Sequence, residues 1–76
     1  MARDYAKAFY KSTEWNNVRE SILMRDNYLC TMCGNPATLV HHIVHITPYN
    51  INNPRITLGA DNLTSLCKDC HYEEHR

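Results

Sequence analysis

Apolar residues recur at helical spacing between residues 13 and 27, which predicts an amphipathic helix there. The predicted apolar face consists of four side chains: Trp15, Val18, Ile22 and Leu23. Ser12 or Thr13 offers an N-cap, and Glu14 is well placed to interact with the dipole of the first turn. We expect the helix to end near Asp26 and to bury Trp15 as an anchor of the core.

An apolar and β-branched run over residues 37–43 predicts a short strand, and we expect a second short strand over residues 63–66. Residues 47–60 lie between them and are rich in proline and asparagine, which is typical of a loop. After the second run, Asp69 can cap a final helix that carries three further side chains: His71, Tyr72 and His75. Helices and short strands in this order predict an α+β fold.

The first eleven residues show no clear periodicity. We expect residues 1–11 to form a loosely ordered lead, with the aromatic pair Phe9 and Tyr10 docking on the core. Residues 12–76 then form one domain. A domain of this size buries a modest fraction of its surface and usually needs a disulfide or a metal ion as a staple.

Composition narrows the location and the partners of the chain. The first residues lead into charged sequence, and no stretch approaches the roughly 20 apolar residues of a transmembrane helix. We therefore expect a cytoplasmic protein without a membrane partner. The formal net charge is zero, which argues mildly against a strong non-specific nucleic-acid binder, although bound metal ions would change the local charge. Arg19 and Arg25 fit ordinary charges on a helix surface better than phosphate contacts, and Arg55 is a candidate contact to a DNA backbone.

The four cysteines form two Cys-x-x-Cys pairs, Cys30 with Cys33 and Cys67 with Cys70. Gly34 follows the first pair and permits the tight turn of a zinc knuckle. Four thiolates favour tetrahedral zinc with no open position, so we expect a structural Zn²⁺. The alternatives are two disulfides or a thiol redox pair, but the redox interpretation needs a βαβ setting that is absent.

The histidines suggest a second, open metal site. His71 and His75 are four residues apart, so a helix places them on one face. His41 and His42 are adjacent on a predicted strand and point to opposite faces unless the backbone departs from ideal extension. One histidine from the strand would complete three nitrogen ligands and leave positions for water and phosphate. His45 matches no ligand pattern, and we expect it to be exposed or hydrogen-bonded.

These motifs occur in an order that resembles one known family. A Cys-x-x-Cys pair precedes the first strand, and three further motifs follow it: His41-His42-Ile43, Asp61-Asn62-Leu63 and Cys67-x-x-Cys70-His71. The order resembles the HNH (ββα-metal) nucleases, above all the small phage and prophage HNH endonucleases. The resemblance covers residues 12–75. It implies an HNH nuclease domain over residues 12–76, a small zinc-stapled fold with an N-terminal helix, a zinc knuckle and a ββα-metal motif.

The resemblance also assigns roles. His41 matches a metal-ligand position, and His42 matches the general base that takes a proton from the attacking water. Asn62 matches the middle residue of the motif, whose amide pins the loop that carries the base. His71 matches the closing metal ligand, and His75 matches an extra ligand present in some members. The resemblance thus implies three histidines around one catalytic divalent ion, which is Mg²⁺, Mn²⁺, Ni²⁺ or Zn²⁺.

The implied function is a metal-dependent DNA endonuclease that nicks or cuts double-stranded DNA by single-metal phosphodiester hydrolysis. The products would carry 5′-phosphate and 3′-hydroxyl ends. The resemblance implies a role in phage genome processing or packaging, with a terminase as partner, in the cytoplasm of a bacterial host. Because basic residues are few, a second copy of the chain in a homodimer is a further expected partner. The leading alternative is a non-catalytic zinc-ribbon module that binds nucleic acid or protein, and a thiol redox protein ranks last.

Overall fold

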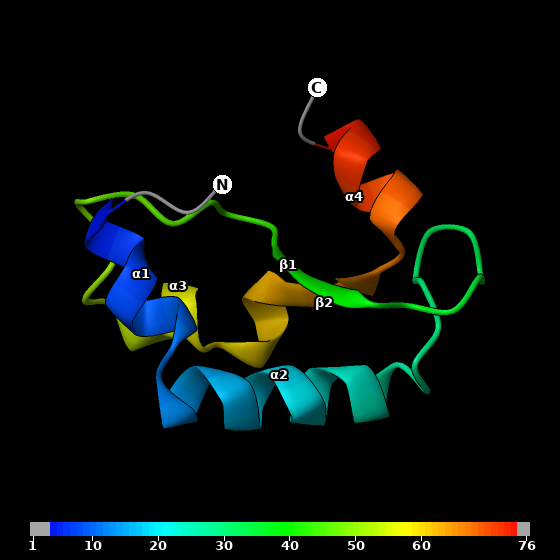
Figure 1. Ribbon diagram of the computed structural model, residues 1–76, viewed down its shortest axis with the longest axis horizontal. Helices are drawn as coiled ribbons and strands as arrows, with labels where there is room; N and C mark the ends of the chain where they lie inside the picture. The colour runs from blue at the N-terminus through cyan, green and yellow to red at the C-terminus, as the bar shows by residue number, and fades with distance from the viewer. Residues whose placement is uncertain (1–3, 75–76) are drawn as a thin grey trace.

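The computed structural model describes residues 4–74 and has the predicted α+β class (Figure 1). A two-stranded sheet lies between α2 on one side and α4 on the other, and α1 and α3 lie at one end of the molecule. The elements follow one another as α1 (Asp4–Tyr10), α2 (Thr13–Arg25), β1 (Leu39–His42), α3 (Pro54–Thr57), the 3-10 turn η1 (Ala60–Asn62), β2 (Leu63–Leu66) and α4 (Lys68–Glu74). No helix in this described part of the chain is both long and apolar enough to cross a membrane.

The predicted amphipathic helix is confirmed as α2. Ser12 is its N-cap, and the Ser12 hydroxyl accepts a hydrogen bond from the backbone N–H of Trp15 at 3.1 Å. At the other end, Asn27 adopts a left-handed φ of 57°, and the N–H of Tyr28 donates to the Leu23 carbonyl at 2.8 Å. These bonds form a Schellman-type C-terminus that satisfies the last carbonyls and stops the helix. α2 buries Trp15, Ile22 and Leu23, as its apolar pattern predicts.

The strands β1 and β2 pair antiparallel, with His41 opposite Thr64 and His42 opposite Leu63. β2 has the predicted bounds, and β1 is shorter than the predicted run of residues 37–43. Because successive side chains of a strand point to opposite faces, His41 and His42 leave the sheet in opposite directions. The sheet therefore separates the two histidines of the pair.

The buried residues fall into two small clusters of different chemistry. The first is apolar and consists of Trp15, Ile22 and Leu63, with half-buried Phe9 and Val40 among its neighbours. The second consists of Cys30, Leu66 and Cys67, with Cys70 packed against it. The second cluster thus joins one leucine to thiol groups. Such a cluster gains little stability from the hydrophobic effect. A metal ion bound by the sulfur atoms would supply additional folding free energy.

The N-terminal segment differs from expectation. Residues 4–10 form the helix α1, where the sequence predicted a loosely ordered lead over residues 1–11. Ala6 is buried, and the phenol of Tyr5 donates to the backbone carbonyl of Ile46 at 3.0 Å. Phe9 and Tyr10 dock on Trp15 as expected, with ring centroids 5.3 Å and 5.6 Å away. These tertiary contacts stabilise a helix that is too short to persist by propensity alone.

Two further boundaries correct the sequence prediction. The predicted loop over residues 47–60 contains α3, which has Asn53 as N-cap and Pro54 in its first turn, where a missing N–H costs nothing. Asp69 does not cap the final helix, because α4 begins at Lys68 and Asp69 lies inside its first turn. The thiol of Cys67 takes that role, since it accepts a hydrogen bond from the N–H of Cys70 at 3.4 Å.

Two arginines connect α2 to the sheet, so they are more than the surface charges that the sequence suggested. The Arg25 guanidinium donates to the carbonyls of Ala60 at 3.0 Å and Leu63 at 2.8 Å, and it forms a bidentate pair with Asp26. Asp26 in turn accepts from the N–H of Ser65 at 3.1 Å. Arg19 donates to the Thr38 carbonyl at 3.0 Å. These bonds fix β2 against the C-terminal end of α2.

Candidate metal centres and catalytic site

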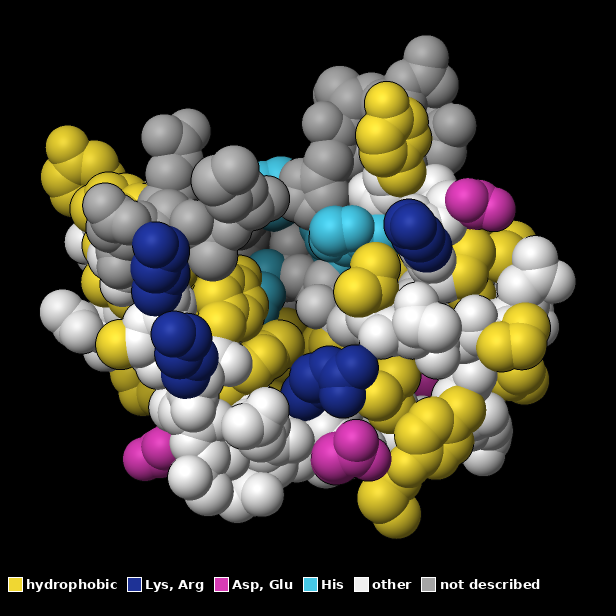
Figure 2. Space-filling view, in the orientation of Figure 1, with side chains coloured by type: hydrophobic (Ala, Val, Ile, Leu, Met, Phe, Trp, Pro, Cys, Tyr) yellow, Lys and Arg dark blue, Asp and Glu magenta, His cyan; other side chains and the backbone are white. Residues whose placement is uncertain are grey.

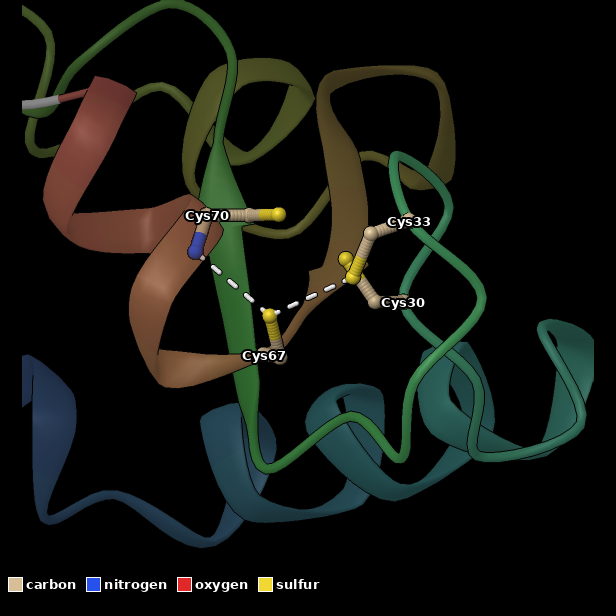
Figure 3. A group of neighbouring side chains, drawn as sticks. All are labelled: Cys30, Cys33, Cys67 and Cys70. Atoms are coloured by element: carbon tan, nitrogen blue, oxygen red, sulfur yellow. Dashed lines mark hydrogen bonds between the residues drawn. The ribbon is translucent and has the colours of Figure 1, made fainter.

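The four cysteines converge at the junction of the knuckle, β2 and α4. Cys30 and Cys33 come from the knuckle, Cys67 follows β2, and Cys70 lies in the first turn of α4. Figure 3 shows their sulfur atoms pointing toward one another, and all four sulfur atoms lie within 4.8 Å of each other. All four are free thiols, which excludes the disulfide alternative for this structure.

The spacing of the thiols fits a tetrahedral ion. The sulfur atoms of Cys33 and Cys67 are 3.6 Å apart. Two thiolates on one tetrahedral zinc are separated by about 3.8 Å when each bond is about 2.3 Å. Gly34 has a φ of 80°, and its N–H donates to the Cys30 carbonyl at 2.9 Å, so the glycine makes the tight turn that the knuckle requires. The cluster is therefore positioned to bind a metal ion.

Electrostatics at the cluster also favour a cation. Burial tends to raise the pKa of the Cys30 thiol, but the backbone N–H groups of Cys67, Cys33 and Met32 lower that pKa to about 6. Hydrogen bonds with the thiols of Cys67, Cys33 and Cys30 raise the pKa of Cys70 far above its usual range. Four thiolates at this distance repel one another. A bound divalent cation would remove that repulsion and allow all four to ionise.

His41 and His71 meet on the α4 side of the sheet. Their ring centroids are 5.4 Å apart, with the rings nearly perpendicular at 78°. The ring of His45 also lies near the ring of His41, with centroids 5.5 Å apart and an interplanar angle of 83°. His41 is buried, with 6% of its surface exposed, whereas His45 is exposed. Figure 2 shows histidine side chains gathered in a hollow in the middle of one face, with Lys and Arg side chains around it.

The predicted histidine ligands are thus only partly assembled. The structure brings His41 and His71 together, and His75 lies outside the described residues. Among the side chains that the structure describes, those of residues 5–72, the four cysteines are the one group of three or more potential ligands whose donor atoms all lie within 4.8 Å of one another. The ligand atoms of His41, His45 and His71 do not reach that mutual spacing.

His42 lies on the opposite face of β1, in an aromatic pocket. Its ring stacks on Trp15 with centroids 5.0 Å apart and an interplanar angle of 24°. Phe9 and Tyr10 contact the same ring at their edges, with centroids 6.1 Å and 6.3 Å away. The Nε2 atom of His42 lies 2.9 Å from the carbonyl oxygen of Thr57. A carbonyl can only accept, so Nε2 carries the proton and Nδ1 keeps its lone pair.

Burial sets the charge of His42. Only 6% of the residue is exposed, and this desolvation lowers the pKa of the imidazole, although the Thr57 carbonyl opposes the shift. The neutral ring is therefore the dominant form at neutral pH, as a proton acceptor requires. The sequence pattern predicted a histidine at this position, but it contained no signal for the stacking on Trp15 or for the bond to Thr57.

The side chain of Asn62 connects the segment after β1 to α3. Asn62 Oδ1 accepts from the N–H of Val44 at 2.7 Å, and Nδ2 donates to the carbonyls of Val44 at 3.1 Å and Ile56 at 2.8 Å. The backbone of Asn62 also accepts from the N–H of Ile43 at 2.9 Å. These bonds fix the backbone that directly follows His42. Arg55 is exposed on α3, and its guanidinium has no described role in this arrangement.

The chain is similar to a protein-family model, to individual relatives and to a solved structure. The model of the family described as HNH endonuclease matches residues 30–76, which span both cysteine pairs and all the histidines. The chain is 39% identical over 66 residues to a probable HNH endonuclease of Lactococcus phage SK1, covering 83% of this chain and 70% of the phage protein. It is also 27% identical over 78 residues to the Zorya protein ZorE of Escherichia coli, but it spans only 21% of that protein.

A solved structure has a similar fold. The crystal structure of the HNH endonuclease from the deep-sea thermophilic bacteriophage GVE2, determined with a manganese ion, superposes with a TM-score of 0.76. The two chains are 39% identical, and the match covers 93% of this chain and 78% of the phage enzyme. At this identity the similarity extends to the sequence as well as to the fold.

Proposed function

Because this chain belongs to the HNH endonuclease family, it is a nuclease that hydrolyses phosphodiester bonds, and we propose that it cuts double-stranded DNA with one divalent ion and His42 as general base. The observation that carries the proposal is the buried contact of His41 with His71, whose rings lie 5.4 Å apart on the α4 side of the sheet. Two imidazoles on fixed elements form a nitrogen donor set suited to Ni²⁺ or Zn²⁺.

The two metal centres would have separate tasks. Cys30, Cys33, Cys67 and Cys70 would hold a structural Zn²⁺ in a closed site without an open position. His41 and His71, joined by His75 or another ligand, would hold the catalytic ion. That ion, when bound, supplies charge neutralisation at the phosphate and at the leaving 3′ oxygen.

His42 would activate the nucleophile. The Nε2 atom donates to the Thr57 carbonyl, so the Nδ1 lone pair would accept a proton from the attacking water. The stack on Trp15 restricts the ring, and the bond to Thr57 fixes its tautomer. Since the ring lies on the opposite face of β1 from His41, the scissile phosphate would sit at the end of the strand, where the two faces meet.

Asn62 would support catalysis without contacting the substrate, because its amide fixes Val44, two residues after His42. Because two of the similar proteins are phage HNH endonucleases, we infer that the chain acts in phage genome processing or packaging in the cytoplasm of a bacterial host, beside a terminase. The formal net charge of zero predicts weak affinity for DNA by the domain alone. A second copy of the chain, or the terminase, would add the missing affinity.

A plasmid-nicking assay tests the proposal. The protein is freed of loosely bound ions with a mild chelator, and Mg²⁺, Mn²⁺, Ni²⁺ or Zn²⁺ is then added back singly. At least one ion should convert supercoiled plasmid to open circles whose nicks a DNA ligase can seal, because the ends are 5′-phosphate and 3′-hydroxyl. Intact plasmid with all four ions, in a sample that keeps its fold and its structural zinc, would contradict the proposal.

A further inference from the structure

The ring of His45 lies beside the histidine pair, although the position has no role in the HNH motif order. His41 is flanked by two imidazoles, His71 at 5.4 Å and His45 at 5.5 Å between ring centroids. Both neighbours are nearly perpendicular to the ring of His41, at 78° and 83°. His41 thus lies at the centre of three histidines that come from β1, the following segment and α4.

Both separations match those of imidazoles that share an ion. If each bond from zinc to nitrogen is about 2.1 Å and the angle is tetrahedral, two ligated rings have centroids roughly 5.2 Å apart. Edge-to-face packing alone also produces such distances. The ring distances therefore fit His45 as a metal ligand, and they equally fit simple packing of the rings. A second structural feature favours the ligand role.

The second feature is the backbone that carries His45, which is held from three directions. Asn62 binds both backbone atoms of Val44, and Tyr5 donates to the carbonyl of Ile46 at 3.0 Å. Asn50 donates to the carbonyl of His45 itself at 3.0 Å, and its Oδ1 accepts from the N–H of Thr47 at 2.8 Å. Because this backbone is already fixed, binding of an ion would cost only the rotamer freedom of the exposed His45 side chain.

We propose that His45 is a ligand of the catalytic ion, together with His41 and His71. This inference rests on the proposed function, because it takes the ion to bind at His41 and His71. It differs from the family-based assignment, which takes the third histidine from position 75. In this structure the donor atoms of the three rings do not all lie within 4.8 Å of one another, so the exposed His45 side chain would have to rotate toward the ion on binding. Three nitrogens would still leave coordination positions for water and phosphate.

NMR of the imidazole nitrogens tests the proposal without any nuclease substrate. The full chain, already holding one equivalent of zinc, is titrated with zinc chloride, and long-range ¹H–¹⁵N spectra follow each ring. The ligating nitrogens of His41, His45 and His71 should shift together at the second equivalent. A His45 ring that keeps its chemical shifts while those of His41 and His71 change would overturn the proposal.

Calorimetry with a variant provides an independent measurement. His45→Ala should weaken binding of the second zinc by at least about tenfold, since loss even of outer partners of metal ligands costs about 10–100-fold in affinity. Tyr49→Ala is the matched control, because Tyr49 lies in the same segment and is 99% exposed. Unchanged affinity in His45→Ala, in a wild-type protein that binds the ion and nicks plasmid, would refute this proposal and leave the nuclease function intact. A wild-type chain that binds no second ion would refute the ligand assignment, whether or not it nicks plasmid.

Discussion

The side-chain amide of Asn62 binds both backbone polar groups of Val44, accepting from the N–H at 2.7 Å and donating to the carbonyl at 3.1 Å. An amide is the side chain that can do both at once, because it carries an acceptor and a donor on one planar group. Val44 lies between His42 and His45, so this pair of bonds fixes the backbone next to both rings. Asn62 thus fixes the backbone beside the candidate base His42 from the neighbouring end of β2.

Replacing Asn62 by Ala should therefore reduce nicking strongly while the cysteine cluster still binds zinc. The variant leaves the backbone groups of Val44 and the carbonyl of Ile56 without their partner, which should cost about 1–3 kcal/mol of unfolding free energy. Chemical denaturation and a plasmid assay measure the two effects. Asn52→Ala, an exposed asparagine of the same loop, is the control. Equal unfolding free energies and equal nicking rates for the two variants would show that the side-chain hydrogen bonds of Asn62 support neither stability nor activity.

Replacing Cys33 by Ser should leave the domain unfolded or molten, because metal binding and folding are coupled in a chain whose second cluster is built from thiols. Dispersion in NMR spectra and the zinc content per chain report the outcome. Met32→Ala lies between the same two cysteines and is exposed, so it should keep both fold and zinc. A Cys33→Ser protein with native-like dispersion and a full equivalent of zinc would show that the structural-zinc assignment is wrong.

His42→Ala should keep the fold and both ions but lower nicking by the ~10²–10⁴-fold that a positioned general base contributes. Excess metal should not restore activity, whereas added imidazole should restore part of it by occupying the space beside Trp15. His41→Ala is the matched comparison, since its loss acts through metal affinity and excess metal should partly rescue it. Loss of the second ion in His42→Ala, to the same extent as in His41→Ala, would mean that the two roles are exchanged.

The pH dependence of nicking should reflect the buried state of His42. Desolvation lowers the pKa of His42 below its ordinary value of 6.5, so the neutral base persists into mildly acid solution, and activity should fall only below that value. The folded state binds its proton less readily than the unfolded chain. Stability should therefore decrease as the pH falls below about 6.5, down to the lowered pKa. A ¹H NMR titration of His42 that gives a midpoint at or above 6.5 would contradict both statements.

Acid should also weaken the contact between α2 and β2. The side-chain hydrogen bond from Arg25 lowers the pKa of Asp26 to about 2, with help from Ser65 and against the effect of burial. Because the folded pKa is depressed, this stabilisation is present above about pH 4 and is lost as the pH falls toward 2. Asp26→Asn should lower the unfolding free energy at pH 7 by on the order of 1–2 kcal/mol and have a much smaller effect near pH 2.

The control for Asp26 is Glu20→Gln on the same helix. Glu20 pairs with Arg19 at 3.6 Å, but its side chain is 59% exposed, and such surface pairs contribute little. Urea denaturation of the three proteins at both pH values gives the comparison. Equal losses for Asp26→Asn and Glu20→Gln at pH 7 would show that the charged pair of Asp26 with Arg25 does not stabilise the fold.

The sequence was sufficient to predict features with local causes. Helix α2 has an apolar period and a cap at Ser12, and β2 begins and ends with leucine. The spacing of the two Cys-x-x-Cys pairs can be read directly from the sequence. The helix α3 was missed, because Pro54 signals a loop and a helix start equally well. Arg25 was taken for a surface charge, because its partners are carbonyls about 35 residues away that no periodicity marks. The contact between the rings of His45 and His41 was also missed, because no spacing in the sequence marks the turn that brings them together.

Because Trp15 stacks on His42, the intrinsic fluorescence of the protein can report the protonation state of His42. Trp15 is the only tryptophan of the chain, so its emission arises from a single environment. A protonated imidazole in contact with an indole ring interacts with its π electrons and quenches its fluorescence, whereas a neutral imidazole does so far less. With centroids 5.0 Å apart, the indole lies close enough to distinguish the two states. Emission of the unlabelled protein should therefore follow the protonation of His42 directly, without isotope labelling and without DNA.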